Sequence, residues 1–220
     1  MKQPFVAHVA CLVTVLLVAG PAAGAQERSG FVSSAEVRRL FNQYLAPEFR
    51  ERLIGDLAYR VDELNQAFGW LQRARIPDQV PASLVRGLRV DFEALSAARI
   101  APEIRHLAVD DLIMKGEFCR RAPEGLGAHV PVSVRTLLKT AEEKGWEVVY
   151  KTAVEAASDA IPPTPFPNIS SPTIENFTVG RFIVWARDPQ QRDRAGERKD
   201  LIVDGKQRGQ TLDVTVPAPK

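Results

Sequence analysis

Residues 180–187, Gly-Arg-Phe-Ile-Val-Trp-Ala-Arg, decide the fold of the second half of the chain. Their apolar side chains alternate with a period of two, which is typical of a β-strand. The alternation gives the strand two apolar faces: Phe182, Val184 and Ala186 on one, Ile183 and Trp185 on the other. One face is expected to lie in a core, so the opposite face must be covered or must bind something.

Further strands are predicted on the carboxy-terminal side of this segment. The charged stretch 187–200 is predicted to be a solvated loop, and it is followed by the apolar residues Leu201–Val203. Asp204-Gly205 then predicts a hairpin turn, because Asp-Gly pairs tolerate the positive φ angles of tight turns. A last strand is predicted from the alternating residues Leu212, Val214 and Val216.

Strands are also predicted on the amino-terminal side of residues 180–187. Val130–Thr136 and Trp146–Lys151 both alternate, and short helices are predicted over Leu137–Lys144 and Val154–Ala160. The proline-rich stretch 161–167 must be an extended surface crossing, because proline fixes the backbone and lacks a donor. Several short strands with turn signals predict a β-sandwich over residues 128–217.

The preceding residues, 26–122, show helical spacing instead. Ser33 and Glu36 fit a capping box, and residues 102–121 predict a helix that opens with proline. Other helices are predicted from apolar residues at steps of three or four: Val37, Leu40, Phe41, Tyr44 and Leu45; Phe49, Leu53, Leu57, Val61, Leu64, Phe68 and Leu71, as one long helix with a surface pair between Asp56 and Arg60; and Leu84, Leu88, Phe92 and Leu95. The fold class is therefore predicted to be α+β, with an amino-terminal α-helical region and a carboxy-terminal antiparallel β-sandwich.

The first 25 residues have the pattern of a secretory signal peptide. Lys2 supplies the positive charge, residues 5–18 are mainly apolar, and Ala23-Gly24-Ala25 forms a small-x-small cleavage site. The apolar stretch is too short to span a membrane comfortably. We expect cleavage before Gln26 and a periplasmic or secreted protein without a membrane span.

One segment resembles a known family. The run from Ser171 to Ala186 is similar to a pattern in carboxypeptidase-regulatory-like and prealbumin-like β-sandwiches, where a turn at a glycine leads into a core strand. Here Phe177, Gly180, Phe182 and Val184 match it. Modules of that kind are usually accessory domains, and the resemblance implies no catalytic residue. The helical region resembles no family in this way.

Composition excludes some classes of partner. The chain has 29 Lys and Arg residues and 27 Asp and Glu residues. Removal of residues 1–25 takes away only Lys2, which leaves a net charge near +1. Nucleic-acid binding would need a clustered basic face, so no nucleic-acid partner is expected.

Few residues are candidates for catalysis or metal binding. Cys119 is the only cysteine after residue 25, and a nucleophilic cysteine would need a base such as His106 or His129. The spacing of these three residues matches no zinc motif. Adjacent acids such as Asp110-Asp111 diverge and are predicted to be solvated, so neither an enzyme, nor a metal site, nor a cofactor is expected.

Three aromatic residues are candidates for binding. Trp146, Tyr150 and Trp185 could form a platform for sugar rings or a partner chain if they share an outward face. We therefore expect a non-catalytic envelope protein that acts as an interaction or structural module, with a protein or glycan as its partner. Two alternatives remain: a carbohydrate- or peptidoglycan-binding accessory module, and a cysteine-dependent hydrolase.

Overall fold

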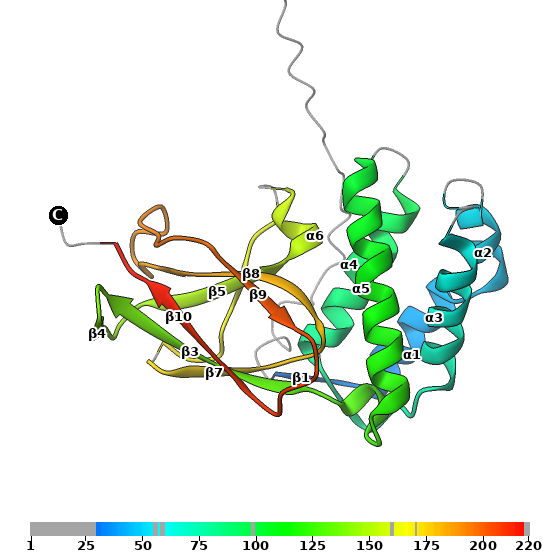
Figure 1. Ribbon diagram of the computed structural model, residues 1–220, viewed down its shortest axis with the longest axis horizontal. Coiled ribbons are helices and arrows are strands. Elements are labelled where there is room, and N and C mark those ends of the chain that lie inside the picture. The colour runs from blue at the N-terminus through cyan, green and yellow to red at the C-terminus, as the bar shows by residue number, and fades with distance from the viewer. Residues whose placement is uncertain are drawn as a thin grey trace, which may run out of the picture.

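The computed structural model describes residues 30–54, 57, 60–97, 100–158, 161–169 and 171–217. The predicted signal peptide, residues 1–25, lies outside these ranges. The chain is a mixed α+β protein, and its long helices lie in the amino-terminal half as predicted. Figure 1 shows the helices gathered on one side and two packed sheets on the other, with α4, α5 and α6 near the junction.

Five long helices form the first half. They are α1 (Ser34–Tyr44), α2 (Pro47–Ile54), α3 (Val61–Arg73), α4 (Ala82–Ser96) and α5 (Pro102–Arg121). The bounds of α5 are those predicted, since proline fits the first helical position, where no backbone donor is needed. Among the described residues, no helix is both long enough and apolar enough to cross a membrane.

The prediction of one long helix from Phe49 to Leu71 is wrong. α2 ends at Ile54 and α3 begins at Val61, although Leu57 between them is buried. The sequence has glycine at position 55, a poor helix former. Two consecutive helices that both bury their apolar side chains in one core can show the same apolar spacing as a single long helix. The periodicity alone therefore does not reveal where the first helix ends.

The predicted partner of Arg60, Asp56, lies outside the described residues; within them, Arg60 binds Glu63 and Asp110. The predicted capping box is not formed. Ser33 precedes α1 without a capping bond from its side chain, and its backbone belongs to a small strand pair, β1 (Phe31–Ser33) with β2 (Gln79–Pro81). The carboxylate of Glu36 binds Arg89 instead.

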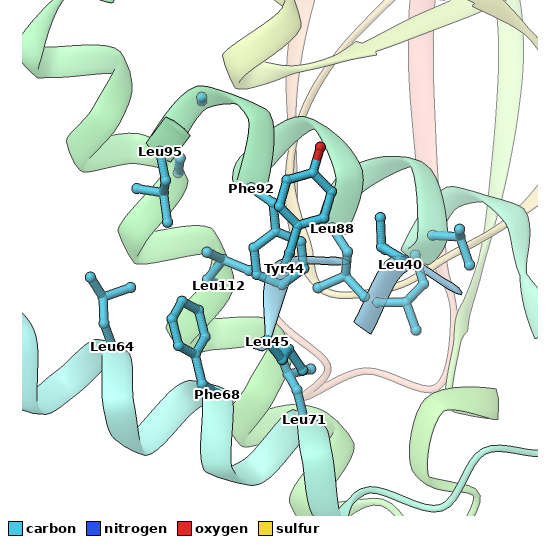
Figure 2. Close-up of a cluster of buried hydrophobic side chains, with 14 of the residues drawn as sticks. Leu40, Tyr44, Leu45, Leu64, Phe68, Leu71, Leu88, Phe92, Leu95 and Leu112 are labelled. Atoms are coloured by element: carbon cyan, nitrogen blue, oxygen red, sulfur yellow. The ribbon is translucent and has the colours of Figure 1, made fainter. Parts of the chain in front are cut away.

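The helices bury an aromatic centre. The rings of Tyr44 and Phe92 stack with centroids 5.1 Å apart, and Phe49 and Phe68 pack around Phe92. Leucines from α3, α4 and α5 surround these rings, as Figure 2 shows. Val154, which follows the first sandwich strands in the chain, also belongs to this core.

The second half is a sandwich of two sheets. One contains β3 (Val130–Leu138), β4 (Ala141–Glu142), β7 (Thr173–Phe177) and β10 (Gln210–Thr215). The other contains, in order, β6 (Thr164–Pro165), β5 (Glu147–Thr152), β8 (Gly180–Arg187) and β9 (Lys199–Val203). Phe182, Val184 and Ala186 face the core between the sheets, as the alternation predicts.

The connections differ from those predicted. β9 pairs with β8, whereas β10 lies in the other sheet. Asp204-Gly205 is therefore part of a connection between the two sheets and not the turn of a hairpin. β10 runs parallel to β3, which makes this pair the exception in an otherwise antiparallel sandwich. Neither feature is visible in the alternation of a single strand, because that pattern does not identify the partner strand.

Other local differences are smaller. Residues 137–144 contain the end of β3 and β4 where a helix was predicted, with Lys139 at φ 58° in the turn. The predicted helix over Val154–Ala160 is a single turn, α6 (Ala153–Ala156), and Ala160 lies outside the described residues. The proline-rich crossing is extended, and its β6 segment pairs with β5.

Candidate functional site

The three aromatic candidates do not form one exposed platform. Tyr150 is 3% exposed and points into the sandwich core, where its ring packs against Phe166 and Phe177. Trp185 is 6% exposed and lies on the opposite face of the same sheet. It pairs with Val149 on β5, and Val149 and its neighbour Tyr150 point to opposite faces. The expected shared face is therefore wrong.

The two tryptophans are each covered by an arginine of the loop after β8. The guanidinium of Arg198 lies 5.1 Å from the ring centre of Trp185, and that of Arg194 lies 5.2 Å from the ring centre of Trp146. Such cation–π contacts cover an aromatic ring with charge and leave it less free to stack on a sugar. These aromatic residues have structural roles in the described fold.

Cys119 lies on α5 and is 1% exposed. Burial raises the pKa of its thiol to about 12, so almost no thiolate forms near neutral pH. His129 is turned toward the backbone, with Nδ1 2.9 Å from the carbonyl oxygen of Gly127. The described residues contain no group of three or more His, Cys, Asp or Glu side chains that could hold a metal ion.

Asp110 and Asp111 diverge as predicted, but only Asp110 is at the surface. Asp110 accepts a hydrogen bond from Arg60 at 2.7 Å. Asp111 is 1% exposed, so its predicted solvation is wrong. Its carboxylate lies 3.5 Å from Nζ of Lys115, one helical turn further along α5.

Lys115 is the centre of a buried triad with Asp91 and Asp111. Its Nζ lies 2.7 Å from Oδ2 of Asp91 on α4, and no member side chain is more than 2% exposed. Gly87 makes room for it, since a Cβ at that position would lie 3.0 Å from Lys115 Cε. The missed signal was a charge on the apolar face of each helix, negative on α4 and positive on α5.

Burial and the neighbouring charges act in opposite directions on Asp91 and on Lys115. Burial raises the pKa of Asp91 to about 7, while the charge of Lys115 opposes this shift. The two carboxylates in turn raise the pKa of Lys115 above its usual value, despite burial.

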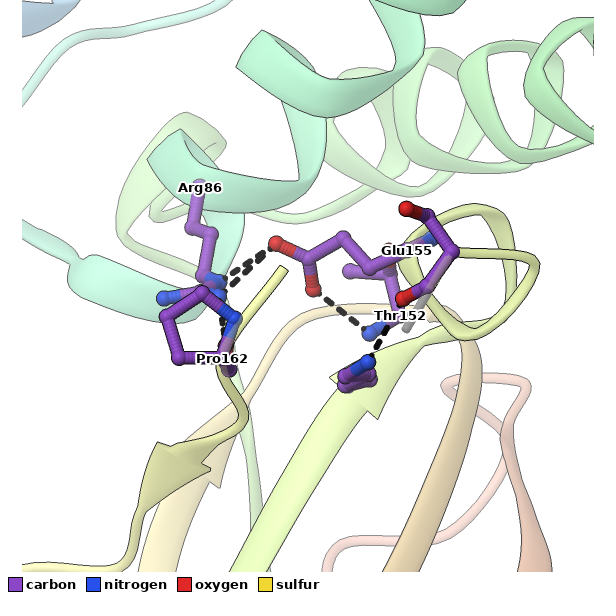
Figure 3. Close-up of polar contacts among 6 residues, drawn as sticks. Arg86, Thr152, Glu155 and Pro162 are labelled. Atoms are coloured by element: carbon purple, nitrogen blue, oxygen red, sulfur yellow. Dashed lines mark hydrogen bonds and ion pairs between the residues drawn. The ribbon is translucent and has the colours of Figure 1, made fainter. Parts of the chain in front are cut away.

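A second ionic contact joins α4 to α6. Glu155 accepts from Arg86 Nε at 2.9 Å and from the backbone N–H of Thr152 at 2.9 Å, as Figure 3 shows. The Thr152 hydroxyl accepts in turn from the N–H of Glu155, which completes a capping box. Arg86 also lines a nearby cavity of about 30 Å³, which has room for one water molecule and not for a substrate.

A further hollow lies on the helical side. It is an open groove of about 510 Å³ between the end of α1 and the end of α3. Four apolar residues and three polar residues line it: Phe41, Leu45, Ala46 and Ile76, with Arg38, Asn42 and Gln72. Its shape follows from the sequence, because α1 ends at Tyr44 and Pro47 starts a new helix in another direction.

The lining of the groove carries one positive charge. Arg38 is exposed and is the only charged residue among those that line the groove in the described structure. Gln72 donates from Nε2 to the carbonyl oxygen of Leu45 at 3.2 Å, which links the two walls. Arg73 and Arg75, next to lining residues in the chain, are also exposed. An apolar lining with positive charge at its rim can bind an apolar group that carries a carboxylate.

Comparison with known proteins does not identify a family for this chain. No family model matches the chain, and no curated protein matches it significantly.

Proposed function

We propose that the protein is an exported, non-catalytic interaction module, and that it binds a short peptide segment of an envelope partner in the groove between α1 and α3. The observation that carries this proposal is the lining of the groove, which combines apolar side chains with a single positive charge. Its volume of about 510 Å³ lies within the usual range for ligand sites. A few side chains of a peptide fit such a space.

The lining also specifies the chemistry of the peptide. Phe41 and Ile76 offer apolar contact, Asn42 offers hydrogen bonds to a peptide backbone, and Arg38 favours a carboxylate. The expected segment has an apolar anchor residue beside an aspartate or glutamate. The glycan-binding alternative has less support, because Tyr150 and Trp185 are buried.

Peptide selection on the purified protein tests this proposal. Random twelve-residue peptides displayed on phage are selected on the wild-type protein, and the affinity of the recovered peptides is measured by fluorescence polarisation. We expect enrichment of apolar residues next to acidic residues. Arg38→Glu should weaken binding by at least about tenfold, because it replaces attraction by repulsion at the rim.

A matched control is Arg208→Glu, the same change of charge at an exposed position of the sandwich half. It should bind the selected peptides as the wild type does. Phe41→Ser should weaken binding without a change of charge. The proposal is wrong if folded protein enriches no such peptides, or if Arg38→Glu and Arg208→Glu bind them equally well.

A further inference from the structure

We infer that the Asp91–Lys115–Asp111 triad is a proton-binding site that stabilises the junction between α4, α5 and the start of β8. It holds one proton while these elements are packed together and releases it when the junction opens to water. The inference is independent of the groove and of its partner. It concerns how firmly the helices are held to the sandwich.

The first argument is the net charge of the triad. Two carboxylates and one ammonium group give the closed triad a net charge of −1, with side chains at most 2% exposed. An uncompensated charge in such surroundings is unfavourable by several kcal/mol, so the site gains by taking up a proton. A proton on the carboxyl group of Asp91 makes the triad neutral.

The second argument is the set of unmade hydrogen bonds. Oδ1 of Asp91 and Oδ1 of Asp111 are buried and have no hydrogen-bond partner among the residues that the structure describes. A carboxylate oxygen without a donor is unfavourable in a dry interior, whereas a protonated carboxyl group needs fewer donors and can itself donate. The geometry therefore fits one proton better than none.

Among the described residues, no positive charge other than Lys115 acts on the Asp91 carboxyl group. α6 presents Glu155, whose negative charge also raises the pKa of Asp91 and whose own partner is Arg86. On α5, the neighbour of Lys115 is the neutral thiol of Cys119. From β8, Gly180 approaches, since a Cβ there would lie 3.7 Å from Asp111 Oδ2.

The position of the triad links this proton to the junction. Asp91 is on α4, Asp111 and Lys115 are on α5, and β8 begins next to Asp111. Opening this contact would hydrate the carboxyl group of Asp91 and return its pKa to the ordinary acidic range, so the proton would leave. The junction should therefore be firmer in a mildly acidic medium than in a mildly alkaline one.

The test is a pH titration of the folded protein by NMR, with ¹³C-labelled aspartate carboxyl groups. The wild type should show a carboxyl group that titrates with a midpoint near 7, as the pKa of Asp91 indicates. Hydrogen exchange should show that the amides around Asp91 on α4 and Asp111 on α5 open about tenfold more often at pH 8 than at pH 6, after correction for intrinsic exchange.

Asp91→Asn should remove both the titration and the dependence of opening on pH. The control is Asp110→Asn, which removes a neighbouring surface carboxyl group and should keep both. If Asp91→Asn does not fold, the titration and the hydrogen exchange of the wild type decide, with Asp110→Asn as the reference. Absence of any aspartate titration above pH 6 in the wild type would overturn the inference, as would equal opening at pH 6 and pH 8.

Discussion

Arg86 on α4 and Glu155 on α6 form an ion pair of 2.8 Å in which the glutamate side chain is only 3% exposed. The same carboxylate completes the capping box of α6 with Thr152. One side chain therefore fixes the first turn of a helix and joins that helix to the other half of the molecule.

Glu155→Ala should destabilise the protein by about 2–4 kcal/mol, because it removes the cap and leaves a partly buried guanidinium group without its partner. Urea unfolding followed by circular dichroism measures the loss. Glu155→Gln should lose less, since its amide oxygen can still accept a hydrogen bond. Arg121→Ala, which removes an exposed pair with Glu117, is the control and should change little. A loss no larger than that of the control would contradict the assigned role.

Phe92→Ala should be among the most destabilising substitutions, with a loss of about 3–5 kcal/mol. Phe92 is fully buried, and three aromatic rings pack around it, so truncation leaves a cavity that its neighbours cannot fill. Ile202→Ala is the control, because Ile202 is 60% exposed. Equal midpoints of thermal unfolding for the two variants would show that the aromatic centre is not a main source of stability.

Cys119 should react very slowly with a thiol-directed reagent in the folded protein at pH 8. With the pKa of its thiol raised to about 12, the thiolate fraction is at least about a thousandfold below that of an ordinary cysteine. The rate of absorbance change with an aromatic disulfide reagent measures this, and the urea-unfolded protein is the reference. Rapid labelling of the folded protein would bring the cysteine-dependent hydrolase back into consideration.

The signal-peptide prediction has a direct test, because cleavage fixes a new amino terminus. Protein recovered from a cell envelope or medium fraction should begin at Gln26, and intact mass spectrometry should show the loss of residues 1–25. Ala25→Leu should block cleavage, whereas Ala22→Leu, outside the small-x-small motif, should not. Uncleaved wild-type protein that begins at Met1 in the cytosol would contradict export.

The sequence predicted local features well where all the residues that determine the feature lie in one short segment. The two faces of β8 and the ends of α5 are examples, since strand alternation and an initial proline act within a few residues. Partners across the fold were not predictable in this way. The position of Gly205 between two sheets depends on β3, which lies some seventy residues earlier in the chain.

The triad and the groove were missed for a related reason. Asp111 and Lys115 have the spacing of an ordinary surface pair on a helix. Only the packing of α4 on α5, with Gly87 as the point of close approach, makes them buried. The groove likewise needs the end of α1 beside the end of α3, and neither helix alone indicates a binding surface.

The parallel pairing of β10 with β3 has a consequence for biosynthesis. β3 lies between β7 and β10, and the side-chain pair Arg135–Asp213 joins residues 78 positions apart. A nascent chain therefore displays one unpaired edge of β3 until residues 210–215 emerge. Unpaired edges recruit other strands, so newly made molecules should depend on a chaperone during this interval, and a premature stop codon shortly before residue 210 should yield aggregates and not a shortened folded protein.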